Sequence, residues 1–163
     1  MFDVLVYLYE HYSAASAWPD SDALTRKLTA AGFEQGEIDD ALAWLQGLAR
    51  VTQDQLAVRD ARADTFRVYT AYETNRLGHE AVAFLAFLEG AGQLSGAQRE
   101  IVIERALAAG LSQEAGDDGH GDGPMPLLRL KLIVLMVLWS QQADIDVLLL
   151  EELLDDGDDR LLH

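Results

Sequence analysis

Apolar residues recur along most of this chain at the three- and four-residue spacing of an amphipathic helix. Phe2, Leu5, Leu8 and Tyr12 follow this spacing and predict a first helix, which the Trp18–Pro19 pair ends. A second helix is expected to begin at Asp20 or Ser21, either of which can cap it, and to stop at Gly32. A third helix is expected from about Gly36 to Ala49, with its first turn stabilised by aspartates.

The second half of the chain predicts further helices. Thr70 and Glu73 have the spacing of a capping box, so a short helix is expected to run from there to Leu77. Another should begin at the cap residue Ser95 and end near Ala109, before Gly110. The segment 79–90 contains AVAFLAFL, which is apolar on every side and predicts a central, buried helix. The segment 127–139 predicts a second buried helix. A last helix is expected over 145–154.

Residues 51–69 have a different pattern. Short β-prone pieces at 55–58 and 66–69 surround polar residues, and this arrangement predicts a small β-hairpin. Two helices joined by a Gly-Phe turn precede it, which is the element order of a winged helix. The predicted fold is therefore mainly α. A winged-helix-like unit with a small β-hairpin occupies residues 1–78, and a helical bundle with an acidic tail occupies residues 79–163.

The segment 112–126 is rich in glycine and aspartate and predicts a surface loop within the bundle. Its carboxylates suggest a calcium loop, but the spacing fails. A loop that starts at Asp118 places Arg129 where a bidentate glutamate is needed, and one that starts at Asp117 places glycines at two ligand positions. We therefore expect no metal site here.

The net charge of the chain favours some classes of binding partner over others. The chain has 163 residues and carries 28 acidic and 12 basic side chains, for a formal net charge of −16. Residues 79–163 hold 16 of the acids and 5 of the bases, so the excess is largest in the second half. This charge disfavours general binding to phosphate backbones and favours a basic protein partner. The candidate partner-binding residues are the tail residues Asp155, Asp156, Asp158, Asp159, Leu161 and Leu162.

A local excess of arginine keeps nucleic acid as the alternative partner. The arginines lie between the third helix and the short helix that follows the hairpin, in the order Arg50, Arg59, Arg62, Arg67 and Arg76. Acidic residues are interleaved with them. The first turn of the third helix, which would enter the major groove, carries Glu37, Asp39 and Asp40, and these repel DNA.

The sequence contains no motif typical of a catalytic, phosphate-binding or metal site. The chain has no cysteine, and its histidines (His11, His79, His120 and His163) are too scattered for a metal site, with His79 expected nearest the core. There is no phosphate-binding glycine loop and no serine in a nucleophile-elbow context. We expect no catalytic, cofactor-binding or metal-ligating residues, no cofactor and no enzymatic activity.

The longest apolar runs span eight residues, well short of the roughly 20 needed to cross a bilayer. The first residues carry Asp3 and Glu10 and lack a basic segment, so they do not resemble a signal peptide. A cytoplasmic location without membrane contact is expected.

Several collinear stretches resemble the Smg family of uncharacterised bacterial proteins. They are MFDVLVYLYEHY (1–12), LTAAGFEQGEIDDALAWLQGL (28–48), FRVYTAYETNRL (66–77), FLAFLEGAGQLSGAQREIVIERALA (84–108), LKLIVLMVLW (130–139) and EELLDDGDDRLLH (151–163). The 112–126 loop departs from the family pattern. The resemblance implies a bacterial cytosolic protein, and it supplies no catalytic residues.

Two functions follow as hypotheses. The first is a non-enzymatic interaction protein that binds a basic macromolecular partner through its acidic helical half. The alternative is a winged-helix-like nucleic-acid-binding protein that uses the arginines of residues 50–76. The sequence leaves the oligomeric state open.

Overall fold

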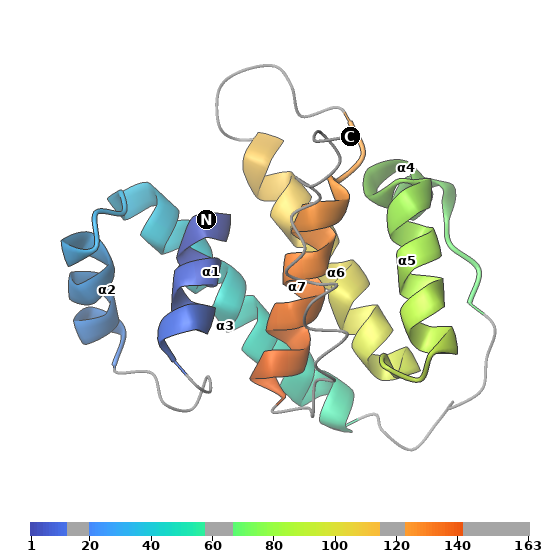
Figure 1. The fold of residues 1–163 in the computed structure, drawn as a ribbon, viewed down its shortest axis with the longest axis horizontal. Helices are drawn as coiled ribbons and strands as arrows, with labels where there is room; N and C mark the ends of the chain where they lie inside the picture. Colours follow the sequence, from blue (N-terminus) through green and yellow to red (C-terminus); the bar gives the residue numbers. More distant parts are fainter. Residues whose placement is uncertain (13–19, 58–66, 115–122, 142–163) are drawn as a thin grey trace, which may run out of the picture.

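The computed structural model describes residues 1–12, 20–57, 67–114 and 123–141. These residues form seven helices: α1 (Phe2–His11), α2 (Ser21–Ala30), α3 (Gln35–Ala57), α4 (Ala71–Leu77), α5 (His79–Gly90), α6 (Gly96–Glu114) and α7 (Leu127–Ser140). Figure 1 shows α2 at one edge of the molecule and α5 at the other, with α1, α3, α6 and α7 between them.

The helix ends follow the predicted capping chemistry. The Asp20 carboxylate accepts a hydrogen bond from the amide of Ala23 at 2.8 Å, and this resolves which residue caps α2. Gly32 has a φ of 101°, a backbone conformation that side chains with a Cβ rarely adopt, and it stops the chain after α2. Ser95 exchanges two hydrogen bonds with Gln98 at the start of α6. The predicted caps at Asp20 and Ser95 are therefore confirmed.

The predicted β-hairpin is wrong. Residues 51–57 continue α3, residues 67–70 have no regular structure, and no strand occurs in the described ranges. Val51 packs against the apolar core from the end of α3, so tertiary contacts outweigh its β-propensity. Without the hairpin, the described residues have no wing, and the winged-helix-like unit is not supported.

Two further helix boundaries differ from prediction. α6 continues to Glu114, so Gly110 lies inside the helix and residues 112–114 are not loop. Glycine does stop helices elsewhere in this chain, at Gly32, where φ is positive. Gly110 does not have a positive φ, so its effect on α6 is limited to the propensity cost of glycine within a helix, about 1 kcal/mol. The predicted helix at 145–154 lies outside the described residues.

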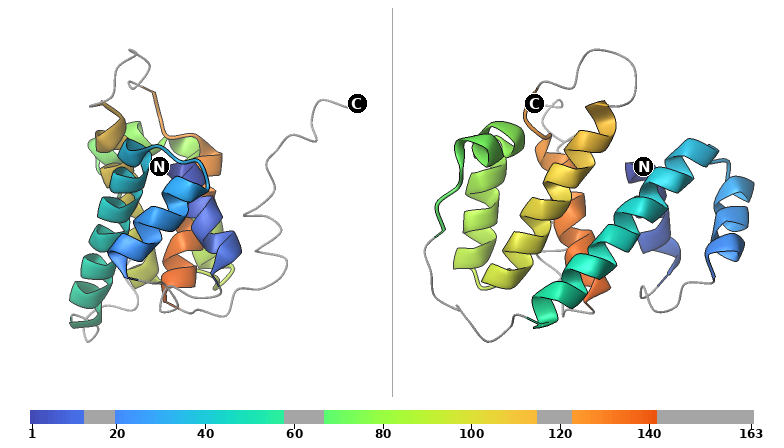
Figure 2. Two further views of the ribbon diagram at one scale, coloured as in Figure 1. Left: turned by 90° about the vertical axis from the view of Figure 1, so that its left-hand side faces the viewer. Right: turned by 180° about the vertical axis from the view of Figure 1, so that it is seen from behind.

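α6 and α7 lie side by side in the middle of the fold, and both views of Figure 2 show α3 crossing near α6. α1 packs on α3 and α7, while α4 packs on α5 and α6. The buried apolar residues form one cluster that extends from Val4 to Trp139. The division at residue 78 stays a prediction about independent folding units, and the contacts of α1 with α7 and of α3 with α6 cross that position.

A reciprocal pair of hydrogen bonds joins α3 to α6. The indole N–H of Trp44 donates to the carbonyl of Arg105 at 3.0 Å, and an Arg105 guanidinium N–H donates to the carbonyl of Trp44 at 3.4 Å. Gly47 lies beneath the same guanidinium, and a Cβ at position 47 would come within 2.9 Å of the Arg105 Cζ. The absence of a side chain at Gly47 therefore lets the Arg105 side chain lie between the two helices.

Candidate functional site

The outer side of α5 exposes apolar side chains. α5 buries Ala81, Leu85 and Leu88, but the Phe87 side chain is 62% exposed, and Ala83 and Ala86 are exposed beside it in sequence. The prediction that this helix is central and buried is therefore wrong, because α5 lies at an edge of the fold (Figure 1). A run that is apolar on every side contains no polar stripe to mark which side meets solvent.

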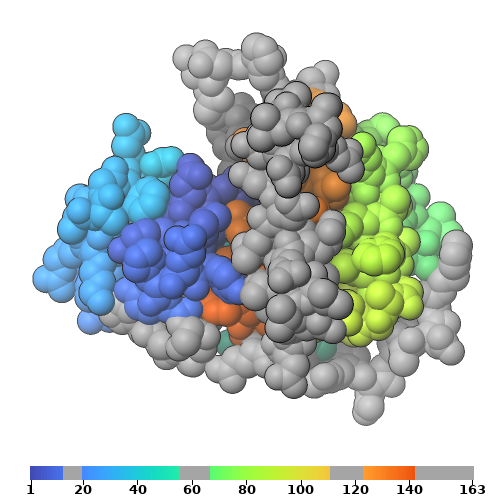
Figure 3. Space-filling view, in the orientation of Figure 1, coloured from blue at the N-terminus to red at the C-terminus, as the bar shows by residue number. Residues whose placement is uncertain are grey.

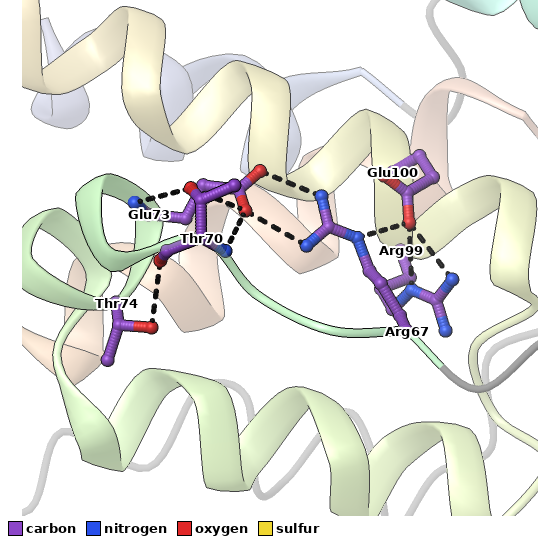
Figure 4. A network of polar contacts seen from close by, with 6 residues as sticks. All are labelled: Arg67, Thr70, Glu73, Thr74, Arg99 and Glu100. Carbon is purple, nitrogen blue, oxygen red and sulfur yellow. Dashed lines mark hydrogen bonds and ion pairs between the residues drawn. The ribbon is translucent and has the colours of Figure 1, made fainter.

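An ion-pair network holds the segment before α4 against α6. The Arg67 guanidinium binds both oxygens of Glu73, at 2.7 and 3.1 Å, and its Nε donates to Glu100 of α6 at 2.7 Å. Figure 4 shows Arg67 lying between these two carboxylates. The hydrogen bonds from Arg67 lower the pKa of Glu73 from its usual 4.5 to about 2, so this carboxylate is charged at neutral pH.

Arg99 extends the network from α6 to α5. Its guanidinium binds Glu100 at 2.9 Å and Glu89 of α5 at 2.5 Å. α5 is therefore fixed on α6 by an ion pair at its C-terminal end as well as by its buried leucines. Arg67 and Arg99 thus form ion pairs with Glu73, Glu89 and Glu100 and hold the segment before α4 and helix α5 against α6. The outer side of α5 takes no part in these ion pairs and remains apolar.

The predicted capping box at α4 is confirmed. The amide of Glu73 donates to the Thr70 hydroxyl at 3.2 Å, and the amide of Thr70 donates to the Glu73 carboxylate at 2.8 Å. Replacing Thr70 with Ala should lower the free energy of unfolding by about 1 kcal/mol, because the amide of Glu73 loses its acceptor. Chemical denaturation measures this change. Thr74→Ala is the matched control, since the Thr74 hydroxyl only donates back to a helix carbonyl, and equal losses in the two variants would contradict the prediction.

The predicted nucleic-acid-binding arginines come from separate elements. Arg50 lies exposed on α3, Arg67 is engaged by Glu73 and Glu100, and Arg76 lies in α4 near the Tyr72 ring. Arg59 and Arg62 lie outside the described residues. Arg67 is bound to carboxylates on both of its sides, so a phosphate would have to displace those partners. Nucleic-acid contact stays a prediction, and the hairpin on which it was built is absent from the described residues.

The predicted partner-binding residues of the tail lie outside the described residues. They are Asp155, Asp156, Asp158, Asp159, Leu161 and Leu162. The central part of the glycine-rich loop, residues 115–122, also lies outside them. The predicted acidity of the second half rests largely on these two segments, because the described glutamates Glu89, Glu100 and Glu104 of that half are paired with arginines.

The structure describes two of the four histidines. His11 stacks on Tyr7, and its ring nitrogen lies 2.8 Å from the Tyr7 carbonyl. His79 is exposed at the start of α5, so the expectation that it lies nearest the core is wrong. Within the described ranges, no group of three or more histidine and carboxylate side chains is placed to hold a metal ion. No helix in this part of the chain is both long enough and apolar enough to cross a bilayer.

A pocket that sequence reasoning missed lies where α4, α6 and α7 meet. It has a volume of about 260 Å³, and its lining includes Arg76, Gly110, Met125 and Arg129. The amide of Met125 donates to the carbonyl of Arg76 at 2.9 Å and so brings the start of α7 up to the end of α4. Arg76 and Arg129 are 53 positions apart in sequence, and no local pattern connects them.

The described residues form an all-helical fold with an exposed aromatic side chain on α5. The chain belongs to the family described as protein of unknown function (DUF494), whose model matches residues 1–163. It is 52% identical to a protein Smg homolog of Bordetella avium, 50% to one of Bordetella petrii and 47% to one of Leptothrix cholodnii. Each of these matches covers all of both chains. The resemblance to the Smg family is thereby confirmed. No solved structure matches the chain.

Proposed function

We propose that this protein is a non-enzymatic binding protein of the bacterial cytoplasm that contacts a basic protein partner through the outer side of α5. The observation that carries the proposal is the exposure of Phe87 on a helix that also exposes Ala83 and Ala86. An exposed aromatic ring surrounded by small apolar residues is typical of the centre of a protein interface, where one large side chain enters a pocket of the partner.

Helix α5 is suited to binding because its inner side is fixed against the rest of the fold. Arg99 bonds to Glu89 of α5, and Leu85 and Leu88 are fully buried beneath the helix. A helix fixed in this way presents its outer side chains without first having to be ordered. The entropy cost of binding is correspondingly lower.

Charge supports a basic partner. The chain carries a formal net charge of −16, and the described arginines Arg67, Arg99 and Arg105 all pair with glutamates. Acidic side chains of α1 to α3 and of the residues just before α2 and α3 are exposed, namely Asp3, Glu10, Asp20, Asp22, Glu34, Asp39, Asp40 and Asp54. The acidic tail residues predicted from sequence add to the same charge. A positively charged partner would be steered toward this protein at low salt.

The test is quantitative capture with Phe87→Ser. Tagged wild-type protein should retain one stoichiometric partner of basic isoelectric point from a bacterial extract, and raising the salt concentration should weaken the retention. Phe87→Ser should reduce capture at least about tenfold, because loss of a buried aromatic anchor typically costs 2 kcal/mol or more. Thermal unfolding should be nearly unchanged, because an exposed side chain contributes little to stability.

Val6→Ser is the matched control. Val6 is a partly exposed apolar residue of α1, which α7 separates from α5 in Figure 1, and this variant should retain full capture. An acidic partner, recovery of nucleic acid in place of protein, or equal capture by wild type and Phe87→Ser would each contradict the proposal.

A further inference from the structure

Four exposed residues form a row along the outer side of α5. They are Glu80, Ala83, Phe87 and Gly90, and their separations of three, four and three residues place them on one side of an α-helix. Figure 3 shows α5 at the surface, on the right of the molecule. The space beside Gly90 is open, because a Cβ at this position would have no contact within 4 Å. A row with this spacing is the contact seam that one helix offers to another.

The Phe87 ring lacks the contacts that the other aromatic side chains of the described ranges make. Five of their rings have the charged group of a lysine or arginine 4.7–5.8 Å from the ring centre. One of the five is Phe84, which Lys131 of α7 contacts. The remaining aromatic side chains contact another ring or, for Trp44, donate a hydrogen bond. Phe87 is therefore the only described aromatic residue without a ring, cation or hydrogen-bond contact.

Glu80 places a carboxylate two turns before Phe87 in the same row. It is exposed, and no lysine or arginine of the described residues pairs with it, whereas Glu89 of the same helix is bound to Arg99. A rise of about 1.5 Å per residue puts the Glu80 and Phe87 positions about 10 Å apart along the helix. The row thus presents two features that attract cations, a carboxylate and the negative face of an aromatic ring.

We infer, resting on the proposed function, that this row receives a helix of the basic partner. That helix places one lysine or arginine side chain on the Phe87 ring and a second one at Glu80. Two basic side chains seven residues apart on a helix have the same separation as Glu80 and Phe87, so one partner helix meets both. The small residues Ala83 and Gly90 let the two helix backbones approach closely between and beyond these contacts.

The charges favour a basic helix over a second copy of this chain. Each copy carries a formal net charge of −16, so two copies repel one another. A cation that leaves water to lie on an aromatic face is attracted more strongly than one at an exposed site, and a partner helix packed on the row removes that water. The proposed basic partner supplies such cations.

Replacement of Phe87 with pentafluorophenylalanine in the full-length chain tests the contact with a cation. The fluorines leave the ring flat and apolar but withdraw electrons from its face, so the attraction for a cation is lost. Phe87→Tyr is the matched variant, because tyrosine keeps the negative face. The fluorinated chain should capture the partner from a bacterial extract at least about threefold less well than Phe87→Tyr. A contact that needs only apolar surface would not produce this difference.

The ion pair at Glu80 is tested by removing its charge. Glu80→Gln should lower capture about threefold, the effect of one modest ion pair. Glu10→Gln is the matched control, because Glu10 is equally a glutamate exposed on a helix but lies on α1, and its capture should equal that of wild type.

Photo-cross-linking identifies what lies on the row. Gly90→benzoylphenylalanine is tolerated sterically, since Gly90 has open space around it and does not have a positive φ. Irradiation should link this chain to a partner segment that carries lysine or arginine residues seven positions apart. Attachment to a segment without them, to a second copy or within the same chain would overturn the inference.

The outcomes also separate this inference from the proposed function. If Phe87→Ser loses capture while the fluorinated chain captures as well as Phe87→Tyr, or if the two glutamate variants capture equally, the cation contacts are refuted and the binding role of α5 stands. A wild-type chain that retains no basic partner would contradict both.

Discussion

Replacement of Trp44 with Ala is expected to lower the free energy of unfolding by about 3–5 kcal/mol, the range for deletion of a buried aromatic side chain. Trp44 is only 5% exposed and lies between α3 and α6. Its loss leaves a cavity and removes the hydrogen bond from the indole N–H to the carbonyl of Arg105. A loss of this size is a large fraction of the 5–15 kcal/mol that stabilises a typical domain. Urea denaturation monitored by far-UV circular dichroism measures it.

Trp44→Phe separates the contribution of volume from that of the hydrogen bond. Phenylalanine retains much of the ring but has no N–H donor, so the carbonyl of Arg105 loses one partner and the cost should be about 1–2 kcal/mol. A cost for Trp44→Ala no larger than that for Trp44→Phe would show that packing of the indole contributes little to the contact of α3 with α6. This outcome would contradict the assignment of Trp44 to the core.

Replacement of Arg67 with Met should lower the free energy of unfolding by about 2–3 kcal/mol at pH 7, because Glu73 and Glu100 lose a cation that both of them bind. The side chains of Arg67 and Glu73 are only 18% and 14% exposed, so water replaces the lost hydrogen bonds incompletely. Arg50→Met is the matched control. Arg50 is exposed on α3, and its replacement should change stability by less than about 0.5 kcal/mol.

The effect of Arg67→Met should depend on pH in a defined direction. The Glu73 pKa is lowered from 4.5 to about 2 in the folded protein, so its stabilising contribution is complete above pH 4.5. The contribution is lost as the pH falls from about 4.5 to 2, because the unfolded chain then binds a proton that the folded protein excludes. After allowance for screening by solvent, we expect about 2 kcal/mol of the wild-type stability to disappear over this range.

Denaturation of both proteins at pH 7, 4.5 and 2.5 measures this dependence. The difference in free energy of unfolding between wild type and Arg67→Met should be largest at pH 7 and clearly smaller at pH 2.5. A difference that stays constant across the three values would show that Arg67 stabilises the fold by packing alone.

Local chemistry predicted most of the helices correctly. Asp20, Thr70 and Ser95 cap the helices where their side chains indicate, because a cap depends only on residues within one turn. Segments whose state depends on distant packing were not predictable in this way. Residues 51–57 have β-prone side chains but continue α3, where Val51 meets the apolar core.

The candidate site was less predictable than the fold, for a related reason. The exposure of Phe87 depends on which sides of α5 the other helices cover, and an evenly apolar helix contains no residue that indicates this. The sequence identified Arg67 as a candidate basic residue for nucleic-acid binding. It could not show that Arg67 is paired with Glu100, because these residues lie 33 positions apart. Hydrophobic periodicity and net charge carry no information about such pairs.

The contact between Trp44 and Arg105 also has a kinetic consequence. Helical proteins usually fold quickly because most of their contacts are local, but these two residues are 61 positions apart. Closing a loop of that length costs entropy before any packing energy is gained. Gly47 leaves room in α3 for the Arg105 side chain, so the two helices must meet in one register for the pair to form. We therefore expect the docking of α3 on α6 to be a slow, long-range step in the folding of this chain.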